Sequence, residues 1–128
     1  MTEEDVKHLY ITPALEKDGK WIAEHIGMEH QITDGQINLR GNMVARQRPK
    51  KADYLLYQDG MTPIAVVEAK DNTHSVSYGL QQAKAYAKMM DIPFAYSSNG
   101  DGFTEYDFFT GKERNFGMDD FPSENELV

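Results

Sequence analysis

Two β-rich segments on either side of a turn constrain the fold more than any other feature of the sequence. Asp53–Tyr57 and Ile64–Val67 are dominated by tyrosine and aliphatic residues, and the second segment continues into Glu68–Lys70. Asp59 and Gly60 lie between them, and an Asp-Gly pair is a strong signal for a hairpin turn. The sequence therefore predicts an antiparallel β-hairpin in the middle of the chain.

A helix and two further strands are predicted after this hairpin. Apolar residues recur at helical spacing over residues 75–90, and the Asp-Ile-Pro at residues 91–93 ends the pattern. Phe94–Tyr96 and Phe103–Phe109 favour strands, with a loop over residues 97–102. A hairpin followed by a helix and a strand is typical of an α/β fold, in which the strand after the helix can return beside its predecessor.

The first residues of the chain predict a helix over residues 2–17. Thr2 can cap this helix, and Asp5 three residues later completes a pattern like a capping box. Pro13 is expected to kink the helix or to end it early, because proline lacks a backbone N–H. Asp18–Gly19 is a stop signal.

The remaining segments are expected to connect or to flank these elements. Residues 21–40 are ambiguous, although Thr33–Gln36 is typical of a turn between two short strands. Arg46–Lys51 is basic and favours an exposed connection. From Met118 the chain becomes acidic and polar, which is typical of a linker.

The hairpin brings three chemically significant side chains onto one face. We expect Gln58 to pair with Pro63 across the loop. Counting back from this pair, Asp53 lies opposite Glu68, and Lys70, two residues further along, shares the same face. A loop with an even number of residues preserves this pairing, whereas an odd loop would break it unless a bulge intervened.

Asp53 and Glu68 would then form a pair of opposed carboxylates, which repel each other unless positive charge lies between them. Magnesium meets this requirement, because it prefers oxygen ligands and often takes one or two carboxylates plus water and phosphate. Lys70 can help the attacking water or stabilise charge on the phosphate. The three residues match a site for metal-assisted phosphodiester hydrolysis. The alternative is an ordinary solvated strand face that carries a Glu-Lys pair.

Gln82 and Tyr86 lie four residues apart in the predicted helix and therefore share one of its faces. Glutamine can hydrogen-bond a phosphate or a base edge, and tyrosine can contact the phosphate backbone. The alternative is that Tyr86 packs in the core and that Gln82 is an exposed helix-forming residue.

Taken in order, these residues resemble the PD-(D/E)xK nuclease core with the Gln-x-x-x-Tyr extension that is typical of RecB-like nucleases. Ala52 stands where the family name has a proline. Over nearly its whole length the chain is similar to the N-terminal nuclease domain of the type I restriction enzyme R subunit. The segments that carry this similarity are Thr2–Asp5, Ile11–Leu15, Ile32–Gly35, Lys51–Tyr57, Pro63–Lys70, Phe94–Gly100 and Tyr106–Gly111.

The resemblance implies an α/β fold with a restriction-endonuclease-like core, in which helices flank a mixed central sheet. It also implies a nuclease domain over residues 1–117, with residues 118–128 as an acidic polar linker toward a translocase domain. The implied activity is Mg²⁺-dependent cleavage of DNA. The alternatives are a repair nuclease or junction resolvase on the same core, or an inactive binding module that keeps the fold.

The metal ligands implied by the resemblance are Asp53, Glu68 and the carbonyl oxygen of Ala69. They would bind Mg²⁺, which Mn²⁺ can replace. Lys70 would be the catalytic lysine.

Other residues are assigned a supporting role by the same resemblance. Gln82 and Tyr86 would support the site or touch DNA. Glu3 resembles the family's first-helix acid, with Glu4 and Asp5 as alternatives, although acids in a first turn also simply favour the helix dipole.

The partners implied by the resemblance are DNA, the translocase domains of the R subunit, and the methyltransferase and specificity subunits. The sequence contains no Gly-x-x-x-x-Gly-Lys-Ser/Thr loop. ATP is therefore expected to bind only in the full-length subunit and not in this chain.

The composition bears on DNA binding and on location. A net charge of −8 counts against simple DNA binding, which normally shows a basic footprint, and suggests that other domains hold the DNA. The absence of cysteine excludes disulfides and zinc-thiolate sites and fits a reducing cytoplasm. The acidic opening is unlike a signal peptide and the apolar stretches are short, so we expect a cytoplasmic protein with no membrane partner.

Overall fold

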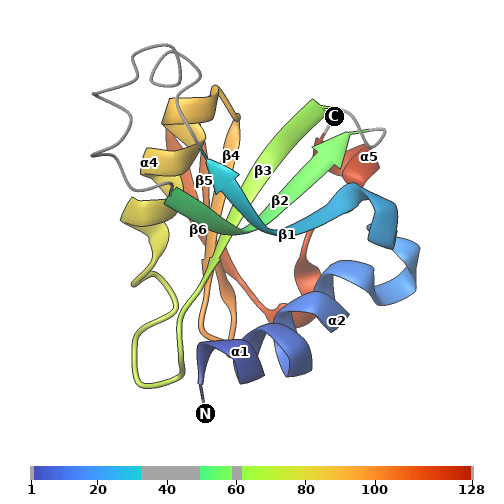
Figure 1. The fold of residues 1–128 in the computed structure, drawn as a ribbon, viewed down its shortest axis with the longest axis vertical. Helices are drawn as coiled ribbons and strands as arrows, with labels where there is room; N and C mark the ends of the chain where they lie inside the picture. Colours follow the sequence, from blue (N-terminus) through green and yellow to red (C-terminus); the bar gives the residue numbers. More distant parts are fainter. Residues whose placement is uncertain (1, 33–49, 59–61, 128) are drawn as a thin grey trace.

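A mixed β-sheet forms the centre of the computed structural model, which describes residues 2–32, 50–58 and 62–127. Within these ranges six strands follow one another across the sheet in chain order (Figure 1). β3 and β4 are parallel and every other neighbouring pair is antiparallel. The strands are β1 (Ile26–Ile32), β2 (Lys50–Gln58), β3 (Thr62–Ala69), β4 (Phe94–Ser98), β5 (Phe103–Asp107) and β6 (Lys112–Phe116).

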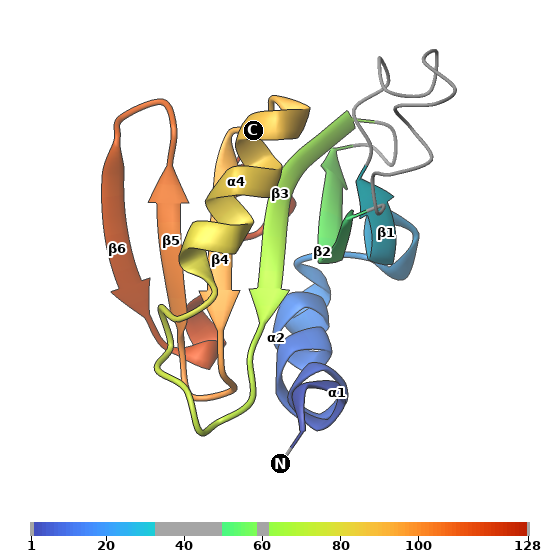
Figure 2. The same ribbon diagram turned by 60° about the vertical axis from the view of Figure 1, so that its left-hand side comes forward.

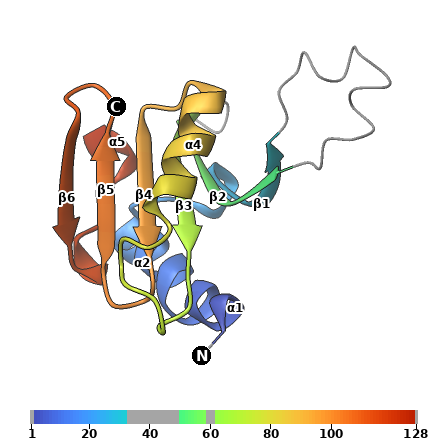
Figure 3. The same cartoon turned by 90° about the vertical axis from the view of Figure 1, so that its left-hand side faces the viewer.

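Helices cover both faces of the sheet, and each face has its own apolar core. Helix α4 (Leu80–Met90) connects β3 to β4 and lies on one face, whereas the N-terminal helices lie on the other (Figure 2). The view in Figure 3 shows the same three layers with α4 in front. The α4 side buries Val66 and Ala83, and the opposite side buries Trp21 and Tyr96. The predicted α/β fold with a mixed sheet flanked by helices is confirmed.

The N-terminal helical run is continuous but not uniformly α-helical. It consists of α1 (Glu3–Val6), a π-helical segment η1 (Lys7–Ile11) and α2 (Thr12–Glu16). Thr2 and Asp5 form the predicted capping box. Pro13 does not end the helix early. The π-helical segment precedes it, and the N–H of Thr12 bonds to the carbonyl of Lys7, five residues back.

Short helical turns complete this part of the chain. The predicted stop at Asp18–Gly19 is confirmed, because both residues have positive φ angles, 57° and 70°. They lie in the 3₁₀ turn η2 (Lys17–Gly19), and a second turn, η3 (Ala23–His25), leads into β1.

The hairpin differs in its register from the prediction, yet it keeps the predicted face. Gln58 pairs with Thr62 rather than with Pro63, which leaves an odd number of residues between the two strands. A bulge then shifts the register: Tyr57 pairs with Pro63 but Leu56 pairs with Ala65. The extra residue on β3 cancels the odd loop, so Asp53 is again level with Glu68. The predicted turn at residues 59–60 lies outside the described residues.

Helix α4 begins five residues later than the predicted start at residue 75. Residues 76–79 form turns instead, with the N–H of Tyr78 bonded to the carbonyl of Ser75. The amide of Gly79 donates to the buried hydroxyl of Ser97 on β4, 3.0 Å away, rather than to a helical carbonyl. This tertiary contact outweighs the apolar periodicity. Asp91, with a left-handed backbone, ends the helix as predicted.

Strands β4 to β6 differ from the prediction in extent and number. β4 continues through Ser97 and Ser98, which were expected in a loop but are fully buried in the sheet. β5 ends at Asp107, before the predicted end at residue 109, because residues 108–111 form the turn to β6. β6 was not predicted. Most of its residues are exposed and polar, as is common at a sheet edge, so they give no clear period-two pattern.

The segment after residue 117, expected to be a polar linker, contributes to the core. It contains the 3₁₀ turn η5 (Met118–Asp120) and α5 (Glu124–Leu127). Between them Phe121 is 1% exposed and contacts the rings of Tyr96 and Phe103. That the segment leads toward a translocase domain remains a prediction.

Some predicted features fall outside the described residues, namely the turn at Thr33–Gln36 and residues 46–49. We had expected Lys50 and Lys51 to lie in an exposed connection, but both residues belong to β2. In the described part of the chain, no helix is both long and apolar enough to cross a membrane.

Candidate active site

Asp53 and Glu68 lie side by side near the C-terminal end of β3. Asp53 on β2 is half-buried, and one of its carboxylate oxygens, Oδ2, accepts a hydrogen bond of 2.8 Å from the backbone N–H of Ala69 on β3. The backbone N–H of Asp53 in turn lies 3.4 Å from Glu68 Oε1. These reciprocal contacts show that the two carboxylates lie side by side, as predicted.

Glu68 is the more deeply buried carboxylate of this pair. It is 2% exposed, and its position in β3 places it on the face that α4 covers, together with Val66. Burial first, and then hydrogen bonding and charge from Asp53, raise the pKa of Glu68 to about 9. Without added positive charge the pair therefore holds a proton at neutral pH.

Lys70 directly follows β3, and two other predicted site residues, Gln82 and Glu3, contact its ammonium. Its ammonium donates to Oε1 of Gln82 over 3.3 Å, and Gln82 Nε2 donates to the hydroxyl of Tyr86 over 2.8 Å. The two helix residues thus form a relay that ends on the lysine, while Tyr86 also packs in the α4 core. Glu3 Oε1 lies 3.8 Å from the same ammonium.

Glu3 therefore lies beside Lys70 in this structure, with no contact to either opposed carboxylate. In residues 2–32, 50–58 and 62–127, no three His, Asp or Glu side chains are grouped so as to hold a metal. The two alternatives to Glu3 as the first-helix acid make other contacts: Asp5 completes the helix cap and Glu4 pairs with Lys7. A metal ligand from the first helix remains a prediction.

Lys7 is a member of the site that the sequence did not indicate. Its side chain is 4% exposed, and its ammonium lies 3.1 Å from Asp53 Oδ1 and 3.0 Å from Glu4 Oε1. Burial acts to lower the pKa of Lys7, but hydrogen bonds and charge from Glu4 and Asp53 outweigh burial and raise the pKa above its ordinary value. No local spacing signals this contact, because Lys7 and Asp53 are far apart in the sequence.

An aromatic stack beside Lys70 was also not predicted. Tyr78 is 58% exposed and stacks on His74 with ring centroids 4.0 Å apart. The ammonium of Lys70 lies 5.9 Å from the centre of the Tyr78 ring. The four-residue spacing of an aromatic residue and a histidine was the available signal, but it lies in the turns before α4 rather than in a helix.

The donor set fits a hard divalent cation. Two adjacent carboxylates offer oxygen ligands, and burial together with the neighbouring Asp53 carboxylate raises the pKa of Glu68, so a bound cation would favour its charged form. Magnesium commonly takes one or two carboxylates and completes its coordination with water and phosphate, so a third acidic side chain is not required. Asp53 and Glu68 would hold such an ion, with the Ala69 carbonyl as the expected third protein ligand.

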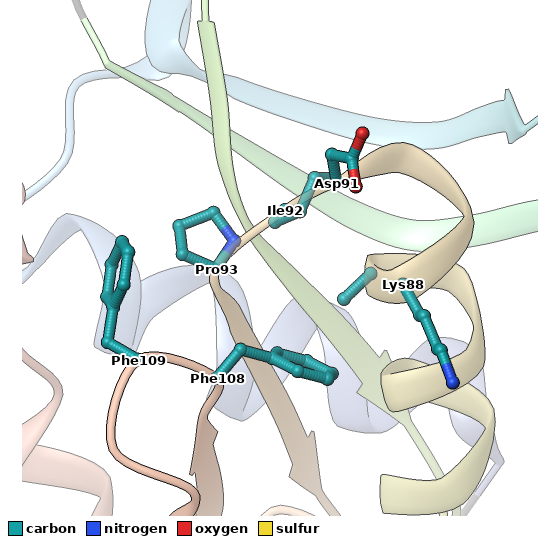
Figure 4. Close-up of a pocket in the computed structure, with 7 residues that line it drawn as sticks. Lys88, Asp91, Ile92, Pro93, Phe108 and Phe109 are labelled. Carbon is teal, nitrogen blue, oxygen red and sulfur yellow. The ribbon is translucent and has the colours of Figure 1, made fainter.

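A hollow in the surface lies at the opposite end of α4 from this site. It has a volume of about 340 Å³ and lies at the far end of α4, between the helix end and the turn after β5 (Figure 4). Its labelled lining residues are Lys88, Asp91, Ile92, Pro93, Phe108 and Phe109. None of these residues belongs to the site around Asp53 and Glu68.

The fold and the site together define a class. An acidic residue on one strand and Glu-x-Lys on the next, on a mixed sheet flanked by helices, constitute a restriction-endonuclease-like core.

Comparisons with known proteins specify the family. A family model described as the second domain of the type I restriction enzyme EcoKI endonuclease subunit matches residues 41–92. The EcoAI endonuclease subunit of Escherichia coli is 37% identical over 131 aligned positions, which cover 99% of this chain and 16% of that protein. A solved fragment described as an HsdR subunit of a type I restriction enzyme from Vibrio vulnificus is 40% identical, with a TM-score of 0.82 over 99% of this chain and 24% of that chain.

The chain therefore belongs to the family of type I restriction enzyme endonuclease subunits, the R subunits. It spans 16% of the length of the curated relative.

Proposed function

We propose that this chain is a Mg²⁺-dependent DNA endonuclease domain of a type I restriction enzyme R subunit, which hydrolyses phosphodiester bonds. The observation that carries the proposal is that Asp53 and Glu68 lie side by side while Lys70 packs beside Glu68 against Gly79. The related EcoAI protein, which is named an endonuclease subunit, supports it.

In this proposal the acidic pair binds the metal and the lysine acts on the reacting groups. Asp53 and Glu68 would hold the Mg²⁺, which when bound would supply Lewis-acid activation of the phosphate and of the attacking water. Both carboxylates would be in their charged form to hold the ion, with the proton of Glu68 released to solvent. Lys70 orients the attacking water or stabilises the charge that develops on the phosphate.

Gln82 and Tyr86 fix the position of Lys70 rather than reacting themselves. A lysine side chain has many rotamers, and a hydrogen bond from its ammonium to Gln82 Oε1 selects one of them. The Tyr86 hydroxyl accepts from the amide of the same Gln82 and so orients its oxygen toward the lysine. The helix face predicted to support the site therefore has a defined contact through which to do so.

The proposed partners follow from the family and from the charge of the chain. DNA is the substrate, and the translocase domains of a longer R subunit and the methyltransferase and specificity subunits are the protein partners. Because the net charge is −8, we propose that these partners hold most of the DNA. ATP would act in the longer subunit.

Calorimetric titration of Mg²⁺ and Mn²⁺ into the protein, combined with a plasmid nicking assay, tests this proposal. The Asp53→Ala/Glu68→Ala double variant is expected to lose both metal binding and cleavage. Lys70→Met is the matched variant: it should retain metal binding and lose at least about tenfold in cleavage rate. Cleavage that survives in the double variant would refute the proposed site.

A further inference from the structure

The strongest unexplained feature beside the proposed metal site is the buried cation Lys7. A lysine side chain that is 4% exposed is rare, because an ammonium loses its hydration when it is buried. Two carboxylates, Asp53 and Glu4, offset that cost at 3.1 and 3.0 Å. Glu4 is 63% exposed, so the partner in the interior is Asp53.

The backbone of Lys7 is held as firmly as its side chain. Its carbonyl accepts the N–H of Thr12 within the π-helical segment, and the hydroxyl of Tyr54 reaches the same oxygen over 3.3 Å. Tyr54 is the neighbour of Asp53 on β2 and is fully buried. The helical run is thus fixed to β2 both through the main chain and through the ammonium of Lys7.

Lys7 and Ala69 together determine how the Asp53 carboxylate is turned. Oδ1 faces the Lys7 ammonium at 3.1 Å, and Oδ2 accepts from the Ala69 N–H at 2.8 Å. Two donors on different elements hold the two oxygens, so the plane of the carboxylate is set. A carboxylate has about four lone-pair sites, so each oxygen still has one with which to bind a metal.

We propose that Lys7 is a positioning residue, which holds the Asp53 carboxylate in the orientation that binds the metal ion. This inference rests on the proposed function, because it assigns Lys7 a role toward the same metal. Lys7 does not touch the substrate, since its ammonium is enclosed between the helix and the sheet. Residues that orient metal ligands typically change metal affinity by about 10- to 100-fold when they are replaced.

Orientation and simple charge repulsion make opposite predictions for the removal of Lys7. If the ammonium only repelled a neighbouring cation, its loss would tighten metal binding. If it orients Asp53, its loss lets the carboxylate rotate, and binding weakens.

The test compares Lys7→Met, Lys7→Arg and Lys17→Met with the wild-type protein. Mn²⁺ affinity is measured by calorimetry without DNA. Lys7→Met should weaken binding by about 10-fold or more, and Lys7→Arg, which keeps a cationic donor, should recover most of the loss. Lys17→Met, which removes a lysine that pairs with Asp119 away from the site, should stay within about threefold. Tighter or unchanged binding in Lys7→Met would overturn the proposal.

A second readout needs no metal. The Ala69 N–H is protected by Asp53, so its hydrogen exchange in Lys7→Met should accelerate relative to that of Val67 in the same strand. Equal acceleration of both amides would indicate a general loss of stability and would count against the inference. The exchange of Ala69 alone could accelerate in Lys7→Met while the wild-type protein binds no metal. That result would support Lys7 as a positioning residue for Asp53 and would refute the proposed metal site. If Lys7→Met does not fold, Lys7→Gln supplies the same comparison.

Discussion

At the scale of single residues, Glu68 links the chemistry of the site to the stability of the fold. It lies in the interior beside another carboxylate, and the pKa of about 9 means that the folded protein favours its protonated form. The unfolded chain would titrate near the ordinary value of 4.5. Protonation of Glu68 therefore contributes fully to the free energy of unfolding below pH 4.5, and this contribution is lost as the pH rises toward 9.

We predict that the metal-free protein becomes less stable between pH 5 and pH 9, and that Glu68→Gln removes this part of the dependence. One pKa unit corresponds to about 1.4 kcal/mol, so the variant should be more stable than the wild type at pH 9 by a few kcal/mol. Urea denaturation in the presence of a chelator, at pH 5, 7 and 9, measures this difference. Parallel pH profiles for the two proteins would contradict the assigned pKa.

At the scale of elements, the start of α4 is set by its contact with the active site. A β-carbon at Gly79 would lie 3.0 Å from Ser97 Oγ and 3.3 Å from both Glu68 Cβ and Lys70 Cε. The backbone of Gly79 is ordinary, with φ −87°, so the need for glycine is steric rather than conformational. The helix end and the two site residues therefore pack as one unit.

Gly79→Ala is expected to displace Lys70 and to reduce cleavage by about tenfold or more, while overpacking costs about 1–3 kcal/mol of stability. Gly19→Ala is the matched control. Its position has a positive φ of 70° and nothing within 4 Å of an added β-carbon, so it should lower stability without affecting cleavage. Nicking rates and urea midpoints of the two variants separate these effects. Full activity in Gly79→Ala would show that the close packing is unimportant.

The elements also show which features the sequence could predict. The hairpin and the shared face of Asp53 and Glu68 followed from local patterning, even though the loop was odd and a bulge restored the pairing. The start of α4 was placed too early, because a hydrogen bond from Gly79 to Ser97 on a distant strand overrides apolar periodicity. β6 was missed because an edge strand with exposed polar residues has little period-two signal.

In the active site, too, some features could be predicted from the sequence and others could not. Spacing predicted that Lys70 shares the strand face of Glu68 and that Gln82 and Tyr86 share one helix face, because a strand and a helix fix the relative directions of nearby residues. The place of Gln82 and Tyr86 beside Lys70 was implied by the family resemblance. The contact of Lys7 with Asp53 could not be predicted, since it depends on how the first helix packs against the sheet.

At the scale of the whole molecule, the last residues close one of the two cores. Phe121 packs against Tyr96, Phe103 and Phe116, and Trp21 donates from its indole N–H to the carbonyl of Pro122 over 2.9 Å. The N-terminal third of the chain and its end are thus joined across the same face of the sheet.

We predict that Phe121→Ala lowers the free energy of unfolding by about 3–5 kcal/mol, because it leaves a cavity among buried rings. Phe109→Ala is the control: this ring is 77% exposed, and its loss should cost within about 0.5 kcal/mol. Urea denaturation of both variants tests the difference. Equal effects would mean that the final segment does not stabilise the domain.

The contact between Lys7 and Asp53 bears on the stage of folding at which the proposed cleavage activity arises. The acidic pair needs β2 and β3, its orientation needs the first helix, and the lysine relay needs α4. These segments are dispersed along the chain and meet only after the sheet has formed, so an incompletely folded chain would lack the complete arrangement. On the proposed function, a newly synthesised chain would therefore remain harmless to its host's DNA until folding is finished.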